Sequence, residues 1–145
     1  VLTEMDLLLE KYFTENPDFC QGFTVSPIPL HFSKMKERGF DQAFLIARQV
    51  ARVLKLPLEG GLLRRVNATS PQASMTRAER SRNIKGAFEV NRPEWVAGKN
   101  ILLVDDVFTT GATVNEAAKT LKKEGAGKVY VFTLGRVVVG KGSGL

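Results

Sequence analysis

The sequence has few of the residue types on which proteins often build catalytic or metal sites. Its 145 residues include one cysteine and one histidine. The single cysteine, Cys20, excludes an internal disulfide and a Cys-rich zinc site, and it is typical of a reducing compartment such as the cytoplasm. His31 has no evident catalytic partner, so we interpret it as a loop residue near an anion rather than as a general base.

Long apolar runs are also absent from the sequence. No run approaches the roughly 20 residues that span a bilayer, so we expect no membrane insertion. The remaining composition, 43% hydrophobic and 25% charged, is typical of a globular protein. At this length we expect one domain over 1–145, with a glycine-rich, disordered tail at 140–145.

Positive charge is concentrated in one segment. The net charge of the chain is +6, and residues 64–85 carry six basic residues against one acid, a net +5. A basic patch confined to one segment points to an anionic partner, either a polyphosphate or a nucleic-acid backbone. A solvated basic helix face explains the same pattern equally well.

Hydrophobic periodicity predicts alternating strands and helices. We expect helices over 4–13, over 42–55 with Asp41 as the N-cap, and after Thr113. We expect strands from Phe23, over 62–66, 87–90, 101–104 and 128–134, a helical turn capped by Thr76, and turns at 92–95 and 98–100. This alternation predicts an α/β fold with a mainly parallel sheet and helices on both faces. Ligands of such sheets bind beyond the carboxyl ends of the strands.

One stretch, residues 101–113, combines the features of a phosphate and sugar site. Four apolar residues are followed by Asp105 and Asp106, and then by the small and hydroxyl residues of Thr109–Thr113 around Gly111. Backbone N–H groups of such a turn and of the helix that follows can bind an anion. Two adjacent carboxylates gain no stability from each other, so we interpret them as functional.

Three other motifs share some of these letters and lack the rest of their pattern. The Gly-rich loop of P-loop NTPases is absent. A receiver domain needs an aspartate on a later strand, and no aspartate follows Asp106. The glycines of 140–144 precede no helix, which excludes a dinucleotide-binding loop.

Residues 101–113 closely resemble the phosphoribosyl pyrophosphate (PRPP) signature of type I phosphoribosyltransferases: four apolar residues, two acids, two further residues and Thr-Gly-x-Thr. Other stretches resemble the ComF family of late competence proteins and its gluconate-utilisation relatives. These stretches are 27–31, 38–42, Gln72, 80–83 with Ala87 and Phe88, and 133–136. The resemblance covers about 25–136. It implies a type I phosphoribosyltransferase fold with a flexible loop over the site.

The resemblance also implies roles for individual residues. The ribose 5-phosphate would bind the turn formed by Val107, Phe108, Thr109, Thr110, Gly111, Ala112 and Thr113. Asp105 and Asp106 would accept hydrogen bonds from the ribose hydroxyls and lie near a Mg²⁺ carried by PRPP. The segment 30–38, with Leu30, His31, Lys34 and Arg38, matches the pyrophosphate-binding loop. The segment 67–85 matches the flexible catalytic loop, in which Arg80 would neutralise the leaving pyrophosphate.

Two departures from the family pattern accompany this match. The usual N-terminal cysteine zinc module is missing, and the chain starts at Val1 with no signal-peptide pattern, so we interpret the sequence as a fragment. Phe108 is bulkier than the residue expected before Thr-Thr-Gly. The acceptor of the phosphoribosyl group has no recognisable pocket in the sequence.

Three functions therefore stay open: a transferase, a competence module that binds single-stranded DNA or a helicase-like partner, and a PRPP-sensing regulator. Assembly of the chain as a homodimer also stays an open prediction.

Overall fold

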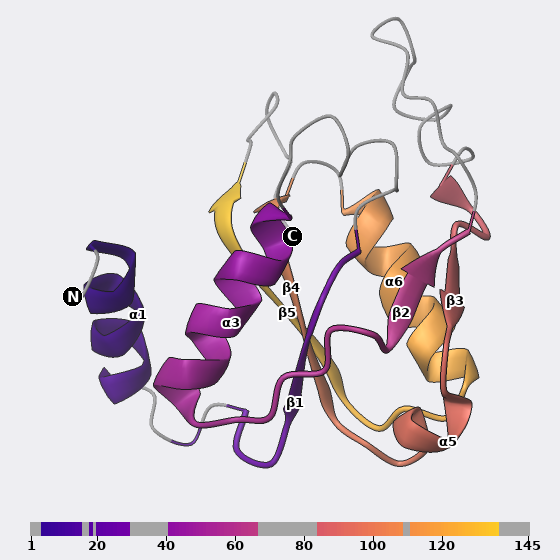
Figure 1. Cartoon of the computed structure of the whole chain (residues 1–145), viewed down its shortest axis with the longest axis horizontal. Coiled ribbons are helices and arrows are strands. Elements are labelled where there is room, and N and C mark those ends of the chain that lie inside the picture. Colours follow the sequence, from indigo (N-terminus) through magenta and orange to yellow (C-terminus); the bar gives the residue numbers. More distant parts are fainter. Residues whose placement is uncertain are drawn as a thin grey trace, which may run out of the picture.

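The computed structural model describes residues 4–15, 18, 20–29, 41–66, 84–108 and 111–136. Helices and strands alternate along the chain, as the sequence predicts (Figure 1). In chain order the elements are α1 (Glu4–Glu15), β1 (Thr24–Pro27), α3 (Gln42–Leu54), β2 (Leu63–Arg65), β3 (Phe88–Val90), α5 (Pro93–Val96), β4 (Ile101–Phe108), α6 (Ala112–Lys123) and β5 (Val129–Arg136). Across the described ranges, none of the helices could span a bilayer.

Three parallel strands form the central sheet in the order β1-β4-β5. In β4, Ile101 pairs with Thr24 of β1 on one side and with Val129 of β5 on the other. Residues 57–59 cover the outer edge of β1, where the Val25 N–H donates to the Pro57 carbonyl and the Glu59 N–H donates to the Val25 carbonyl, each at 2.9 Å. The predicted parallel sheet is confirmed.

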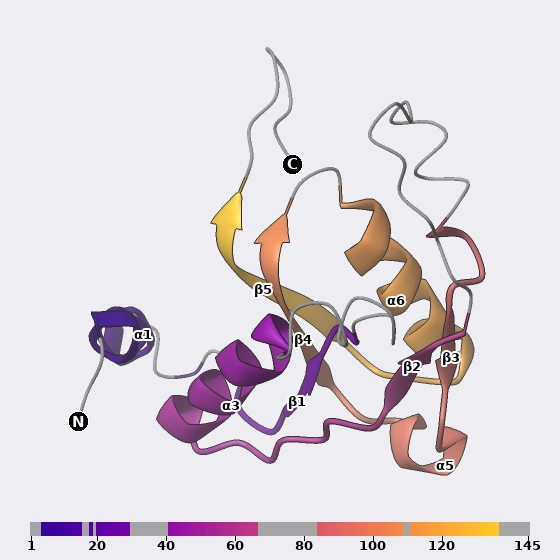
Figure 2. The same cartoon turned by 45° about the horizontal axis from the view of Figure 1, so that its top comes forward.

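The two faces of β4 are covered by different helices. Ile101 and Leu103 pack in a core with α6, whereas Leu102 and Val104 pack in a second core with α1 and α3. This division follows from the alternation of side chains along a strand. Figures 1 and 2 show α3 and α6 on opposite sides of β4. The prediction of helices on both faces is therefore confirmed.

The ends of α3 are fixed by local sequence. The Asp41 carboxylate accepts a hydrogen bond from the Phe44 N–H at 3.1 Å, which confirms the predicted N-cap. At the other end, Lys55 adopts the left-handed conformation with φ 57°, and its N–H returns to carbonyls of the last turn. The start of α3 is thereby fixed beside the carboxyl ends of β1 and β4.

β2 and β3 form a separate antiparallel pair rather than part of the parallel sheet. Leu63 and Phe88 are buried in the α6-side core, so the pair packs on that face of the molecule. In this pair Arg64 is opposite Glu89 and Arg65 is opposite Phe88. The connection between the two strands is residues 67–83, which lie outside the described residues, as do the predicted Thr76 cap and the tail at 140–145.

Two elements differ from the expectation. Residues 92–95 were expected to form a turn, but Pro93–Val96 is a short helix, with proline at its first position. Strand β4 does not end at the acidic pair: it continues to Phe108, because Val107 and Phe108 pair with Gly135 and Arg136 of an equally long β5. The acidic residues therefore lie within the strand.

Candidate functional site

The acidic pair lies near the carboxyl end of the central strand. Asp105 is opposite Thr133 of β5 in the strand register. The Asp106 N–H donates a hydrogen bond to the Asp105 Oδ1 at 2.9 Å, which fixes the orientation of that carboxylate. Asp105 follows the alternation of Ile101 and Leu103, so it lies on the α6 side of β4, where β2 and β3 also pack.

The turn before α6 has the backbone of an anion-binding helix start. Gly111 is buried and has φ 83°, a conformation that favours glycine, and α6 begins at the next residue. The Asn115 N–H donates to the Gly111 carbonyl at 2.8 Å, which closes the first turn. Helix starts of this kind bind phosphate groups in many proteins, and Thr113 of the first turn lines the cavity beside the acids.

A cavity of about 140 Å³ joins the acidic pair to this helix start. Its lining comes from the carboxyl ends of β1 and β4, the start of α3, the end of β2 and the start of α6. The residues are Ile28, Pro29, Gln42, Ala43, Arg65, Asp105, Asp106 and Thr113. The cavity occupies the position where parallel α/β sheets bind ligands.

Arg65 is the charged residue of this cavity that sequence reasoning did not assign to the site. It lies at the end of β2, its guanidinium is 5.3 Å from the centroid of the Phe88 ring, and it lines the cavity with Asp105. Its Nε atom is buried and has no hydrogen-bond partner among the described residues. Burial lowers the pKa of Arg65 and the nearby Asp105 charge raises it, which places the two charges within each other's field. Alternation along β2 was the available signal, because Leu63 and Arg65 share the inward face.

Asp105 is electrostatically unusual. Burial raises its pKa to about 7; the Asp106 N–H and the Arg65 charge lower the pKa, and the Asp106 side chain raises it further. Carboxyl groups with a strongly perturbed pKa in a cavity are common at functional sites. Two adjacent carboxylates at one cavity suit a hard divalent cation that keeps most of its water ligands. Among the described residues, no cluster of three or more metal-ligating side chains occurs.

The structure thus brings part of the predicted site together. Asp105, Asp106 and Thr113 line one cavity, and Gly111 and Ala112 begin the adjoining helix. For Val107 and Phe108 the backbone position at the end of β4 is described. Seven predicted site residues lie outside the described residues: Leu30, His31, Lys34, Arg38, Arg80, Thr109 and Thr110. Their roles stay predictions.

The chain positions that flank the two undescribed segments are informative. Ile28 and Pro29 precede the segment 30–40, Gln42 and Ala43 follow it, and all four line the cavity. Arg65, which also lines the cavity, ends β2 two residues before the segment 67–83. Each of the two segments predicted to carry pyrophosphate-binding residues is therefore connected to the chain at this cavity.

A comparison with protein-family models decides the family. The model described as phosphoribosyl transferase domain matches residues 41–140. The chain belongs to this family. The matched range includes α3, β2, β3, α5, β4, α6 and β5, whereas α1 and β1 precede it.

Curated relatives confirm the resemblance to competence proteins. The chain is 36% identical over 114 residues to competence protein F of Haemophilus influenzae, and the match covers 77% of this chain and 49% of the relative. It is also 36% identical over 111 residues to the DNA utilization protein YhgH of Escherichia coli, with 77% of this chain and 48% of the relative covered. The chain thus spans about half the length of these relatives. Both matches agree with the ComF family prediction.

A solved structure confirms the fold. The chain superposes on the glutamine PRPP amidotransferase of Bacillus subtilis, complexed with ADP and GMP, with a TM-score of 0.57. The sequences are 20% identical, and the match covers 89% of this chain and 26% of the other. At that identity the likeness concerns the fold, which is the predicted type I phosphoribosyltransferase architecture.

Proposed function

We propose that this domain binds PRPP with Mg²⁺ and transfers its 5-phosphoribosyl group to an acceptor, releasing pyrophosphate. The observation that carries the proposal is the pair of opposite charges across one cavity. Asp105 and Asp106 lie on β4 and Arg65 lies on β2, and all three line the same cavity. A ligand that carries both a metal cation and phosphate groups would complement the two acids through its cation and Arg65 through its phosphates.

The parts of PRPP match the parts of the site. The helix start at Gly111 and Ala112, together with Thr113, would hold the 5-phosphate through N–H groups and a hydroxyl. Asp105 and Asp106 would accept hydrogen bonds from the ribose hydroxyls and contact water ligands of Mg²⁺. Arg65 would donate to pyrophosphate oxygens, joined by the predicted Lys34, Arg38 and Arg80. The Asp105 proton would be displaced when the cation arrives.

The site's chemistry would be mainly electrostatic. The acceptor's lone pair forms a bond to the anomeric carbon, and the bond from that carbon to the pyrophosphate oxygen breaks, so the electron pair leaves with pyrophosphate. Arg65 would stabilise the charge that accumulates on the leaving group. The acids would orient the ribose ring. A phosphorylated sugar substrate and the free thiol of Cys20 both suit a cytoplasmic protein.

Pyrophosphate release tests turnover. We would incubate the intact chain with Mg²⁺, PRPP and a panel of purines, pyrimidines and amines, and measure pyrophosphate. The proposal expects release with at least one acceptor and its loss in Asp105→Asn/Asp106→Asn. The control Asp18→Asn/Glu94→Gln removes the same charge from exposed positions outside the cavity and should keep the activity. Binding of PRPP without release across the panel would identify a PRPP-sensing regulator instead.

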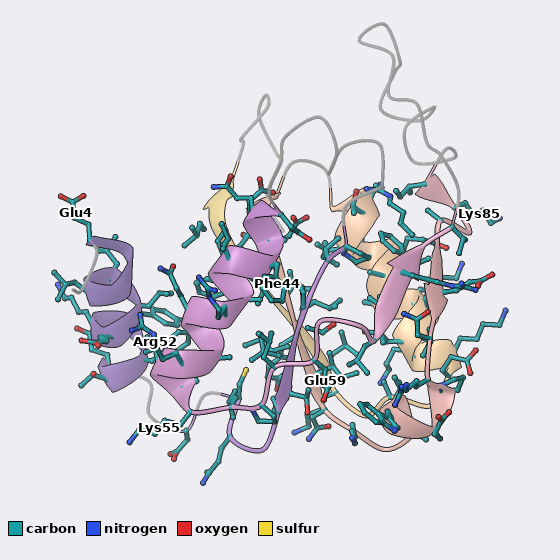
Figure 3. The ribbon with its side chains drawn as sticks, in the orientation of Figure 1. Glu4, Phe44, Arg52, Lys55, Glu59 and Lys85 are labelled. Carbon is teal, nitrogen blue, oxygen red and sulfur yellow. The ribbon has the colours of Figure 1, made fainter. Side chains whose placement is uncertain are left out.

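A second candidate function rests on the names of the relatives. The names competence protein F and DNA utilization protein suggest a module that takes part in the use of DNA. The resemblance to the ComF family implies single-stranded DNA or a helicase-like protein as the partner. The structure gives less support to DNA binding by the basic segment 64–85 than its sequence does. Of its three basic residues that are described, two direct their charge to other groups. Arg65 faces the cavity, and Arg64 forms a salt bridge with Glu89 at 2.6 Å. Lys85 is exposed on the outer side of the molecule (Figure 3).

Salt dependence tests this second candidate. Single-stranded DNA should bind the intact chain with an affinity that falls steeply with salt, and replacing Arg77, Arg80 and Arg82 by Gln should reduce that slope. An unchanged slope would show that the segment does not contact the DNA backbone.

A further inference from the structure

The two edges of the parallel sheet differ in cover. Residues 57–59 hydrogen-bond to β1 and close that edge. On the other side, β5 pairs with β4, and no strand of the described ranges pairs with its outer edge. Figure 2 shows β5 in yellow at the side of the sheet, beyond β4. An open strand edge is a template for adding a further strand.

The hydrogen-bond register identifies the residues that face outward. The Ile101 N–H donates to the Lys128 carbonyl, so the peptide groups of Lys128 face β4. Because backbone groups of successive residues face opposite edges, Val129, Val131 and Thr133 direct their N–H and C=O groups away from β4. None of these three residues has a further backbone hydrogen bond among the described residues. Within the described part of the chain, these three alternate positions therefore offer backbone groups for an added ladder.

The side chains of β5 suit an apolar strand. Tyr130 is 41% exposed, Val131 39% and Leu134 47%. Tyr130 and Leu134 lie on the α3 side of the sheet, and Val131 lies on the α6 side, so both faces offer apolar surface. The residues from Val129 to Gly135 include no charged residue and no proline. Charged residues and prolines are the usual protection of an unused edge, and the stretch 129–135 has neither.

We propose that the open edge of β5 binds an extended segment of a partner protein as an added strand. The partner segment is apolar in its middle and acidic at both ends. Lys128 precedes β5 and Arg136 ends it, so the apolar stretch has a basic residue at each end. Main-chain hydrogen bonds to Val129, Val131 and Thr133 supply affinity, and the apolar and acidic side chains supply selectivity.

The same charges argue against a second copy of this chain. If two β5 strands paired antiparallel over their full length, Lys128 of one copy would lie opposite Arg136 of the other. Like charges directly opposite each other destabilise a strand pair. The net charge of +6 adds to this repulsion.

A peptide probe tests the proposal on the intact chain. The probe is a short blocked peptide of alternating Val and Thr flanked by Asp and Glu, labelled for fluorescence anisotropy. Two matched versions carry N-methyl groups on the amides of one edge or of the other. The proposal expects one methylated version to bind like the parent and the other to lose binding. Equal binding of both versions, or no binding of the parent, would overturn it.

Variants at the edge give an independent readout. Val131→Pro removes one outward N–H without touching the β4 ladder, and Val131→Thr keeps that N–H and the branched shape. We expect a loss of about tenfold or more for the proline variant and little change for the threonine variant. If Val131→Pro fails to fold, the methylated peptides decide alone. A stable dimer that excludes the probe in sedimentation would show that a second copy occupies the edge, contrary to the proposal. The proposal for the β5 edge does not depend on PRPP binding, so either proposal can fail without the other.

Discussion

Arg64 and Arg65 are consecutive in β2, yet their side chains lie on opposite sides of the β2–β3 pair. The Arg64 Nη2 atom is 2.6 Å from the Glu89 Oε2 atom, in an exposed salt bridge. Arg65 turns inward over Phe88 and lines the cavity with Asp105. The two residues carry the same charge, but one lies at the surface and the other at the cavity. They are therefore a matched pair for mutation.

Arg65→Met should weaken PRPP binding by about 10- to 100-fold, because a hydrogen bond to a charged group contributes about 1.5–3 kcal/mol. Arg64→Met should change the affinity little, since an exposed salt bridge contributes little and Arg64 does not line the cavity. Calorimetric titration of both variants with Mg²⁺ and PRPP measures the difference. Equal losses in the two variants would mean that Arg65 acts through the general charge of the segment.

The raised pKa of Asp105 predicts a pH dependence of stability. The folded protein holds this proton up to about pH 7, whereas the unfolded chain releases it near pH 4. The contribution of Asp105 to stability is therefore complete below pH 4 and is lost as the pH rises toward 7. Chemical denaturation at several pH values should show this loss in the wild type and a smaller one in Asp105→Asn. Parallel curves would indicate that Asp105 titrates normally.

The same group links cation binding to pH. A cation must displace the Asp105 proton, so the affinity for Mg²⁺ and PRPP should rise from pH 6 to pH 8 and then level off. Asp105→Asn should bind more weakly and lose most of this rise. A wild-type affinity that is constant over this range would argue against contact between the bound cation and Asp105.

Gly111→Ala should impair binding of the 5-phosphate. Its φ of 83° costs an alanine roughly 1–2 kcal/mol, and relief of that strain would move the helix start. Gly98 has a similar φ of 76°, and a methyl group there meets open space outside the cavity. Titration with ribose 5-phosphate should therefore show a loss in Gly111→Ala that Gly98→Ala lacks, although both lower stability. Equal affinities would exclude a tight role for this turn.

Asp41→Ala tests whether the start of α3 supports the site. Loss of the cap hydrogen bond to Phe44 should lower the free energy of unfolding by about 1 kcal/mol. Because the next two residues line the cavity, PRPP affinity should fall as well, by less than in Arg65→Met. Thermal unfolding and calorimetry on the same sample separate the two effects. A stability loss at unchanged affinity would show that the position of the helix start is not critical.

Much of the fold follows from local patterns. Buried strands, helix periodicity and the Asp41 cap were predictable because each depends on a few neighbouring residues. The acidic pair and the Gly111 turn were predictable because they form one continuous motif. Arg65 was not, because its place in the site depends on β2 packing against the α6 face, which brings residues 40 positions apart together. The extension of β4 to Phe108 was missed for a similar reason: it depends on the length of β5.

The open edge of β5 likewise emerges from topology. The apolar composition of residues 128–134 predicts a buried strand. Its position as the last strand in the order β1-β4-β5 leaves Tyr130 and Leu134 exposed instead. Strand order is a long-range property that periodicity does not encode.

Calorimetric titration of the intact chain with PRPP in the presence of Mg²⁺ tests the central claim most directly. We predict saturable binding at one site, lost or weakened at least tenfold in Asp105→Asn/Asp106→Asn and preserved in Asp18→Asn/Glu94→Gln. Absence of binding to the intact chain, or equal binding to all three proteins, would contradict a PRPP site at the acidic pair.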